Sequence, residues 1–430
     1  MTLVIIAAIL LSIAVGYKTK INIGFFAIVF AYLIGCFGLG LNSSEVIGFW
    51  PIKIFFIILS VTLFYNVAMV NGALEKLANH LLYTCRRFPA LLPLAIFASA
   101  TIIAALGAGF YTVLAFMAPM TLLLCQKTGM SKVIGGMAVN YGALAGANFM
   151  TSQSGVIFRG LMEGAGVTAP QAFVNATAIF AATLAIPVVV IGAYLLMFRG
   201  KLNIQIAAEK PAPFDRKQKQ SLVLILTLMA VLLVFPVLHI LFPHSGSISF
   251  LNSKLDIAFV AIIFSVISLL LRLADEGKVV ALVPWNTLIM ICGVGMLIEV
   301  AIHAGVIDVL SHWVSANIPF LLIPLAMCVI GAFMSMFAST LGVVTPALFP
   351  IVPAIAAATG YSPLILFVCI VVGAQSSAIS PFSSGGSLIL GSAPQQADKT
   401  ALFDDLLFRA VPLGFGAALL ATLVVQAVMA

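Results

Sequence analysis

Long apolar runs separated by short polar turns dominate the hydrophobic pattern of the chain. Many of these runs are long enough, or nearly so, to cross the hydrocarbon core of a bilayer as helices. They cover residues 2–16, 22–41, 50–70, 131–161, 170–198, 220–242, 255–273, 281–300, 361–391 and 405–429. The pattern therefore predicts an all-α polytopic membrane protein.

Two further apolar regions, residues 90–126 and 318–359, are interrupted near their centres by small residues and proline. The interruptions read ALGAGFYT (105–112) and FASTLGVVTP (337–346). Backbone that is not helical is tolerated at membrane depth only where it is buried in protein or lines a cavity. Each region is therefore predicted to be a re-entrant hairpin, which enters and leaves the membrane on the same side.

A hydrophilic linker at residues 199–219 divides the chain near its middle, and the two halves repeat each other. Pairs of small residues recur at a constant offset of 231: Pro119 and Pro350, Gly142 and Gly373, Ser152 and Ser383, Gly155 and Gly386, and Gly160 and Gly391. The repeats are predicted at 1–198 and 220–430. Each holds five crossings and one hairpin, and one crossing in each (131–161 and 361–391) is a helix broken at the midplane. Because five is odd, the second repeat is expected to be inverted.

Composition and charge narrow the class of protein. Hydrophobic residues make up 63% of the chain and charged residues 8%, which excludes a water-soluble domain. With the N-terminus outside, most lysines and arginines fall on the inner side, although Lys53 and Lys254 lie near the outer side and Arg159 lies within the membrane region. We expect a multi-pass protein of a bacterial inner membrane with both termini in the periplasm. No basic, aromatic patch suggests a nucleic-acid partner.

Polar residues gather at the two helix breaks and at the two hairpin tips. Inverted repeats with broken helices are the architecture of secondary transporters, and helix N-termini at such breaks attract carboxylates. Arg159 could face a substrate carboxylate, pair with Glu163, or reach toward the surface. The candidate substrate residues are Gly107, Ala108, Gly109, Phe110, Tyr111, Thr112, Asn148, Thr151, Ser152, Gln153, Ser154, Arg159, Ser339, Thr340, Ser380, Pro381, Phe382, Ser383, Ser384 and Gly385.

Sodium is the expected coupling ion. The Asp and Glu residues lie in loops or near segment ends, with Glu299 and Asp256 closest to membrane depth, whereas hydroxyl and carbonyl oxygens at the tips and breaks suit Na⁺. The candidate Na⁺ positions are near Ala105, Gly109, Asn148, Ala338, Thr340, Ser377 and Ser380. No other cofactor is expected. The sequence has no metal-ligand spacing and no visible nucleophile–base pair, so an enzyme is disfavoured.

Three stretches resemble a known family. FWPIKIFFIILSVTLFYNVAMVNGALEKLA (49–78), ALGAGFYTVLAFMAPM (105–120) and GALAGANFMTSQSGVI (142–157) look like the N-terminal part of the malonate/dicarboxylate carriers (MatC-like). These carriers belong to the ion transporter superfamily, which includes the divalent anion:sodium symporters. The resemblance implies a homodimer with an elevator-type movement. In the symporters a Ser-Asn-Thr triplet occupies each hairpin tip. Here the tips read Ala108-Gly109-Phe110 and Ser339-Thr340-Leu341, so the first offers backbone groups only.

These observations predict a Na⁺-coupled secondary transporter of a small dicarboxylate, such as malonate or a four-carbon acid. Other readings stay open. The chain could be the large membrane subunit of a TRAP-type carrier, which depends on a separate binding protein, or a proton-coupled organic anion transporter. Two further classes are an intramembrane enzyme, which would catalyse a reaction, and a passive channel, which would show flux without saturation.

Overall fold

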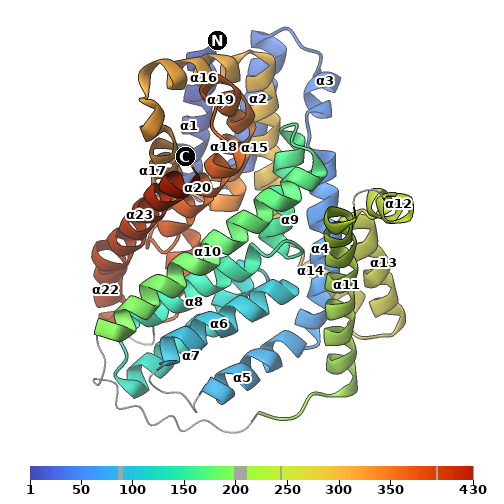
Figure 1. Ribbon diagram of the computed structural model, residues 1–430, viewed down its shortest axis with the longest axis vertical. Coiled ribbons are helices and arrows are strands. Elements are labelled where there is room, and N and C mark those ends of the chain that lie inside the picture. The colour runs from blue at the N-terminus through green and yellow to red at the C-terminus, as the bar shows by residue number, and fades with distance from the viewer. Residues whose placement is uncertain (86–90, 198–210, 243–244, 394–395, 430) are drawn as a thin grey trace.

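Every regular element in the described part of the chain is a helix or a helical turn (Figure 1). The computed structural model describes residues 1–85, 91–197, 211–242, 245–393 and 396–429. In the first half the elements are α1 (Thr2–Thr19), α2 (Ile23–Tyr32), η1 (Leu33–Gly38), α3 (Ser43–Gly48), α4 (Ile52–Val70), α5 (Ala73–Cys85), α6 (Leu92–Ile103), η3 (Ala104–Ala108), α7 (Phe110–Thr128), α8 (Lys132–Ala147), α9 (Gln153–Gly164) and α10 (Ala169–Met197). In the second half they are α11 (Arg216–Leu241), α12 (Gly246–Lys254), α13 (Ile257–Leu270), α14 (Glu276–Ala281), α15 (Trp285–His303), α16 (Val306–Asn317), η4 (Phe320–Leu322), α17 (Ile323–Phe337), η5 (Thr340–Val344), α18 (Thr345–Leu348), η6 (Phe349–Ile351), α19 (Val352–Thr359), α20 (Pro363–Ser376), α21 (Ser384–Gly391), α22 (Gln396–Asp405), η7 (Leu406–Ala410) and α23 (Val411–Met429).

Local sequence explains several helix ends. Asp215 accepts from the backbone of Gln218, and the Gln218 side chain accepts from the backbone of Asp215, which completes a capping box. This box starts α11 at Arg216, inside the stretch predicted as linker. Most of that predicted linker, residues 199–210, lies outside the described residues. Helices α7 and α19 both end at a glycine in the left-handed conformation, Gly129 and Gly360.

The two halves make matching contacts. A Cβ on Gly142 would lie 2.5 Å from the Phe97 carbonyl oxygen, and one on Gly373 would lie 2.1 Å from the Cys328 carbonyl oxygen. All four residues obey the offset of 231. These glycines allow α8 to pack on α6 and α20 to pack on α17 at a backbone separation that any side chain would prevent.

The region predicted as the first hairpin folds as α6, η3 and α7, which meet at a turn where Gly107 and Gly109 have φ of 97° and 72°. Only glycine adopts such values at little cost, so the turn depends on these two residues. The second region folds as α17, then a turn at Ala338 and Ser339, then η5 to α19. Ser339 caps η5 by accepting from the Gly342 amide at 3.1 Å.

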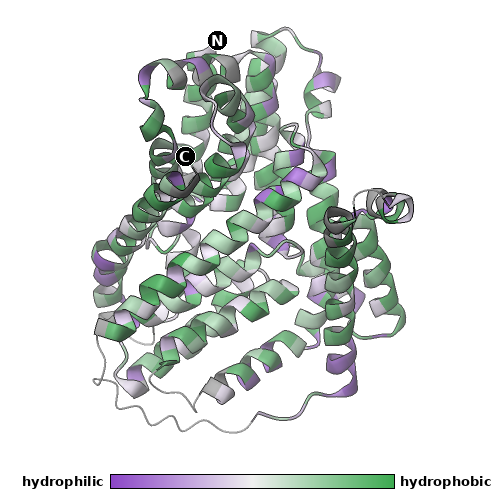
Figure 2. Cartoon of the chain, viewed as in Figure 1, coloured by the Kyte–Doolittle hydropathy of each residue, from purple (hydrophilic) through white to green (hydrophobic). Residues whose placement is uncertain are grey.

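The exterior is that of a membrane protein. Large apolar side chains are exposed along the helices, among them Leu3 (82%), Leu270 (77%) and Phe37 (75%). Figure 2 shows the same character along α10, α11 and α13. In the described chain, seven helical stretches are long and apolar enough to cross a membrane. Several expected crossings form shorter pieces because a break or a π-helical turn interrupts them, as in 131–161. The prediction of an all-helical, multi-pass membrane protein is confirmed.

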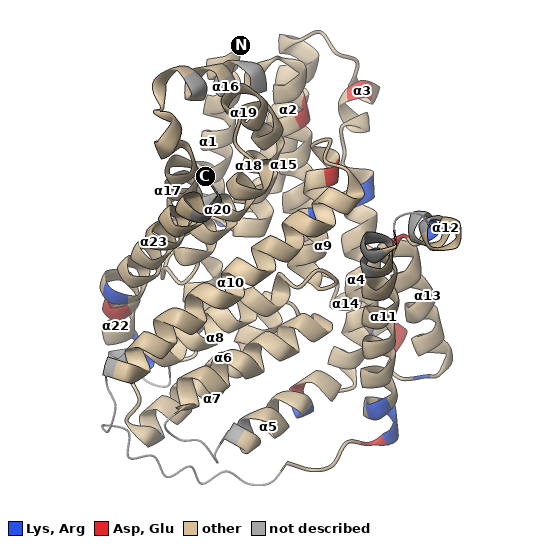
Figure 3. Ribbon diagram, viewed as in Figure 1, with Lys and Arg blue, Asp and Glu red and all other residues tan. Residues whose placement is uncertain are grey.

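The ends of the molecule differ in charge. Figure 3 places lysines and arginines at the start of α11, on α5 and near α22, in the lower half of the view. Helix α16 lies at the opposite end from α5 (Figure 1). The helices α5 and α16 occupy matching places in the order of the two halves, directly after α4 and α15.

Candidate functional site

Both hairpin regions and both helix breaks converge on one small enclosed space, which we call the inner cavity. The first hairpin contributes Phe110 and Tyr111, and the start of α9 contributes Ser154. The remaining lining residues are Leu144, Ser335, Ala338, Ser339, Thr340, Leu341, Gln375, Ala378, Ser383, Ser384 and Gly385. Four segments that lie far apart in the sequence therefore meet at one point.

Helix N-termini determine the electrostatics of the inner cavity. Helices α7, α9 and α21 begin at Phe110, Gln153 and Ser384, and the first residues of each helix line the cavity. The first amides of a helix lack an acceptor within the helix and carry partial positive charge. Three such ends meeting at one cavity make a site for an anion, and the described lining residues include no lysine or arginine.

The inner cavity is closed in this structure. Its volume of about 20 Å³ is enough for about one water molecule and too small for a dicarboxylate. The Tyr111 hydroxyl lies 3.3 Å from Oγ of Ser339, so the two hairpin turns contact each other at its edge. A molecule of that size would fit this space only if the cavity widened.

A much larger cavity of about 720 Å³, which we call the vestibule, adjoins the inner cavity. The two share Tyr111, Ser383 and Ser384. The second break also contributes Pro381 and Phe382 to the vestibule, and the turn between α1 and α2 lines it from another side. The second break is therefore accessible from the vestibule.

The polar residues of the first break bind other protein groups. Asn148 and Gln375 form a reciprocal amide pair with N···O distances of 2.9 and 3.0 Å, and Asn148 also donates to the Thr183 hydroxyl at 3.0 Å. Oγ of Ser152 donates to the Ala104 carbonyl at 2.6 Å. All of these side chains are buried. The break predicted to hold substrate thus ties the two halves of the chain together.

The glycines of the first tip make room for other side chains. A Cβ on Gly107 would overlap the Tyr65 ring, and one on Gly109 would lie 2.4 Å from the Gln153 side-chain oxygen. The Tyr65 hydroxyl donates to the Thr151 carbonyl at 3.1 Å. Helix α4 therefore contacts the first tip and the first break together. Of the other first-tip candidates, Ala108 is buried, while Ala105 and Thr112 are half-buried outside the lining of both cavities.

In the second break, serine hydroxyls hold the chain while remaining close to the cavities. Oγ of Ser383 donates to the Ala378 carbonyl at 2.6 Å and accepts from the Gly386 amide at 3.2 Å. Oγ of Ser377 donates to the Ala332 carbonyl at 2.6 Å. Ser380 is buried, and its Oγ accepts from the Phe382 amide at 3.3 Å. Oγ of Ser335 and Oγ1 of Thr340 are 2.8 Å apart at the second tip.

Asn140 is a polar residue that the sequence reasoning missed. It is fully buried in α8, and neither atom of its side-chain amide has a hydrogen-bond partner within the part of the chain that the structure describes. A Cβ on Gly385 would lie 3.1 Å from its Oδ1 and 2.8 Å from the Phe110 ring, so Asn140 lies directly behind the inner cavity. The offset of 231 pairs Asn140 with Val371, an apolar residue. That mismatch between the halves was the available signal.

Arg159 lies apart from these groups. It lines neither the inner cavity nor the vestibule, and its guanidinium carbon lies 5.4 Å from the centre of the Phe173 ring. Glu163 pairs instead with Lys53, at 2.6 Å, and that pair lines a different cavity of about 280 Å³. The geometry favours an interaction with Phe173 over contact with substrate.

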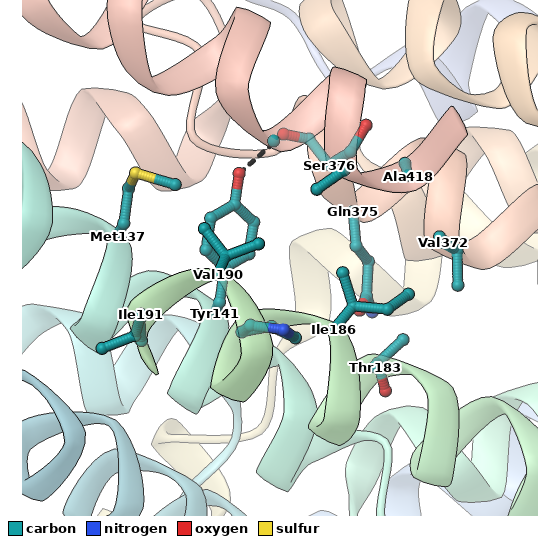
Figure 4. A pocket seen from close by; sticks show the side chains of 13 residues that line it. Met137, Tyr141, Thr183, Ile186, Val190, Ile191, Val372, Gln375, Ser376 and Ala418 are labelled. Atoms are coloured by element: carbon teal, nitrogen blue, oxygen red, sulfur yellow. Dashed lines mark hydrogen bonds between the residues drawn. The ribbon is translucent and has the colours of Figure 1, made fainter. Parts of the chain in front are cut away.

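A fourth cavity lies between α8, α10, α20 and α23 (Figure 4). Apolar side chains such as Met137, Ile186 and Val190 form most of its wall, and its volume is about 40 Å³. Its polar groups are already engaged: Tyr141 donates to the Ser376 carbonyl at 2.7 Å, and Gln375 pairs with Asn148. A carboxylate here would lose its hydration without gaining a donor, so we do not assign substrate to it.

Comparison with known proteins places the chain among transporters in fold. Residues 1–147 match the family described as the dicarboxylate carrier protein MatC N-terminus. The N-terminal third of the chain is similar to the MatC dicarboxylate carriers. The resemblance inferred from the sequence is thereby confirmed. No curated protein sequence matched the chain.

Two solved structures have a similar fold. The YdaH transporter of Alcanivorax borkumensis, whose structure is described as having an unusual topology, shares 18% identity with a TM-score of 0.58, covering 90% of this chain and 87% of that one. MtrF of Neisseria gonorrhoeae, described within a class of antimetabolite efflux pumps, shares 13% identity with a TM-score of 0.51, covering 91% and 83%. At these identities the likeness concerns the fold alone.

Proposed function

We propose that the protein is a Na⁺-coupled secondary transporter of a small dicarboxylate, with malonate and four-carbon acids as the first candidates. The observation that carries the proposal is the inner cavity, where three helix N-termini and several serine hydroxyls meet. Such a site stabilises carboxylate oxygens by partial charges and hydrogen bonds. The similarity of residues 1–147 to dicarboxylate carriers agrees with an acid of this kind.

The oxygens around the inner cavity support Na⁺ as the coupling ion. The second tip and second break bring together the hydroxyls of Ser335, Thr340 and Ser383 with nearby backbone carbonyls. Hydroxyl and carbonyl oxygens of unwound helices are typical ligands of coupling ions in transporters. The predicted positions at Ala338, Thr340, Ser377 and Ser380 belong to this group, and those at Ala105, Gly109 and Asn148 would form a second one.

Movement between two inverted repeats would supply alternating access. The matching glycine contacts at an offset of 231 and the positions of α5 and α16 at opposite ends of the molecule support inversion. An elevator-type movement would carry the hairpins and broken helices past α4 and α15. The lysines and arginines near α5, α11 and α22 support a cytoplasmic location for that end, and hence an inner membrane with periplasmic termini. Dimerisation is carried over from the family resemblance.

The test is uptake of labelled malonate and succinate into proteoliposomes that contain only this protein, with and without an inward Na⁺ gradient. Saturable uptake that requires Na⁺ is the expected result. Uptake driven equally by a proton gradient alone would contradict Na⁺ coupling. No uptake until a soluble binding protein is added would favour the TRAP-type alternative, and flux without saturation would favour a channel.

A further inference from the structure

The vestibule has a wall that belongs to neither the hairpins nor the breaks. The turn between α1 and α2 contributes Lys20, Ile21 and Asn22, and the start of α15 contributes Asn286 and Thr287. Ser384 and Ser387 of α21 also line the vestibule. An anion crossing the vestibule toward the inner cavity therefore enters a space bordered by both the α1–α2 turn and the N-terminus of α21.

The α1–α2 turn is held firmly against α15. Asn22 caps α2 by accepting from the Gly24 amide at 2.9 Å, and its side chain donates to the Asn286 carbonyl at 2.7 Å. A Cβ on Gly24 would lie 2.3 Å from the Ile289 carbonyl, so α2 and α15 are in backbone contact. The position of the turn relative to the vestibule is thus fixed by the fold.

Lys20 occupies this turn in a conformation that suits glycine. Its φ is 62° and its ψ is 12°, in the left-handed region, where a residue with a Cβ is disfavoured. Among the described residues that line the vestibule, Lys20 is the one with a charged side chain. The backbone conformation ends α1 here, and the lysine at this position places an ammonium group on the vestibule wall.

We propose that Lys20 recruits the dicarboxylate into the vestibule, and that the α1–α2 turn forms one wall of the transport pathway. This inference rests on the proposed function. The ammonium group attracts one carboxylate by a screened, medium-range interaction, and the N-terminus of α21 attracts the other. A cleft with low-dielectric walls strengthens such attraction and raises the local concentration of the anion.

Four variants test this role: Lys20→Gln removes the charge, Lys20→Arg keeps it, and Lys20→Gly removes it while suiting the backbone. Lys18→Gln is the matched control, because Lys18 lies in the last turn of the same helix, is exposed, and does not line the vestibule. Exchange of labelled succinate and malonate is measured at low and high salt in right-side-out and inside-out vesicles.

We expect Lys20→Gln and Lys20→Gly to raise KM about 3- to 10-fold at low salt, with Vmax within about 2-fold of wild type. The rise should occur for substrate presented from the cytoplasmic face, on which the proposed topology puts Lys20, and it should shrink at high salt. Lys20→Arg and Lys18→Gln should behave as wild type. Lys20→Gly should fold at least as well as wild type, which separates loss of charge from misfolding.

The inference would be overturned if Lys20→Gln and Lys20→Gly had the wild-type KM from both faces. It would also be overturned if their KM rose equally from both faces, or if KM rose as much in Lys18→Gln. In each of these cases wild-type transport of dicarboxylate would leave the proposed function intact. Absence of dicarboxylate transport by the wild-type protein would instead overturn the proposed function, and with it the role of Lys20.

Discussion

The first helix break directs most of its polar groups to other protein groups, whereas the second presents serines to two cavities. Asn148, Thr151 and Ser152 have no exposed surface and line neither cavity, while Ser383 and Ser384 line both. Yet the glycines that follow, Gly155 and Gly386, contact matching carbonyl groups of Phe149 and Ser380. The backbone follows the repeat in both breaks, but the side chains differ. Those of the first break hydrogen-bond the two halves together, and those of the second break line the cavities.

The largest expected effect comes from the two serines that open α9 and α21. Ser383→Ala removes a hydroxyl from the cavity wall and the cap of α21, so we expect transport (Vmax/KM) to fall by about 10-fold or more. Ser152→Ala removes a bond to Ala104 away from the cavities, so it should lower the unfolding temperature with little change in transport. Uptake assays and thermal unfolding in detergent measure both. Equal loss of transport in the two variants would contradict the functional difference between the breaks.

The next largest expected effect comes from breaking the hydrogen bonds between Asn148 and Gln375, and it should be a lower free energy of unfolding. Asn148→Leu leaves the Gln375 amide buried without its partner, at a cost of about 1–3 kcal/mol. The double variant with Gln375→Leu removes both amides and should recover part of this loss. The free energies of unfolding of the three variants give the coupling between the halves. If the losses of unfolding free energy in the two single variants add up to that of the double variant, the pair does not couple the two halves.

Asn140→Val introduces the residue that the repeat has at the matching position. If Asn140 serves only as packing, removing an unpaired buried amide should stabilise the protein by about 1 kcal/mol or more and leave transport unchanged. We expect stability to be retained and transport to be reduced several-fold, because the amide lies behind Gly385. The same uptake and unfolding assays decide between these outcomes.

Tyr111→Phe should have the smallest effect. The bond from its hydroxyl to Ser339 is long at 3.3 Å, so its loss should change KM for uptake by less than about 5-fold. The direction is informative, because a weaker contact between the tips should let substrate reach the inner cavity more readily and lower KM. A raised KM would mean that the hydroxyl binds substrate rather than closing the cavity.

Sequence reasoning went furthest where the signal was periodic or repeated. Small residues and proline marked both hairpin turns, the offset of 231 related the two breaks, and Phe110, Ser154, Ser339 and Ser383 do lie together around one cavity. Their role as substrate ligands stays a prediction. The composition of small and polar residues marked these stretches, because a helix cannot continue through them at membrane depth without protein partners.

The remaining features depend on contacts between distant segments. Asn148 reads as a ligand by its polarity, and nothing near it in the sequence reveals its partner Gln375. Asn140 is hidden within an apolar helical run. Lys20 resembles an ordinary loop lysine until the α1–α2 turn is placed against α15 and beside the second break. To interpret each of these three residues, one must know where an element from the other half of the chain lies in the fold.

The amide pair between Asn148 and Gln375 can form only late in translation. The two residues are 227 positions apart, so at typical rates of translation the ribosome adds Gln375 about 10–45 s after Asn148. Thr183, 35 positions after Asn148, can accept one hydrogen bond in the meantime. The other hydrogen bonds of the Asn148 amide cannot form until Gln375 has been added. Nascent chains that stop before residue 375 would therefore carry an Asn148 amide that lacks this partner.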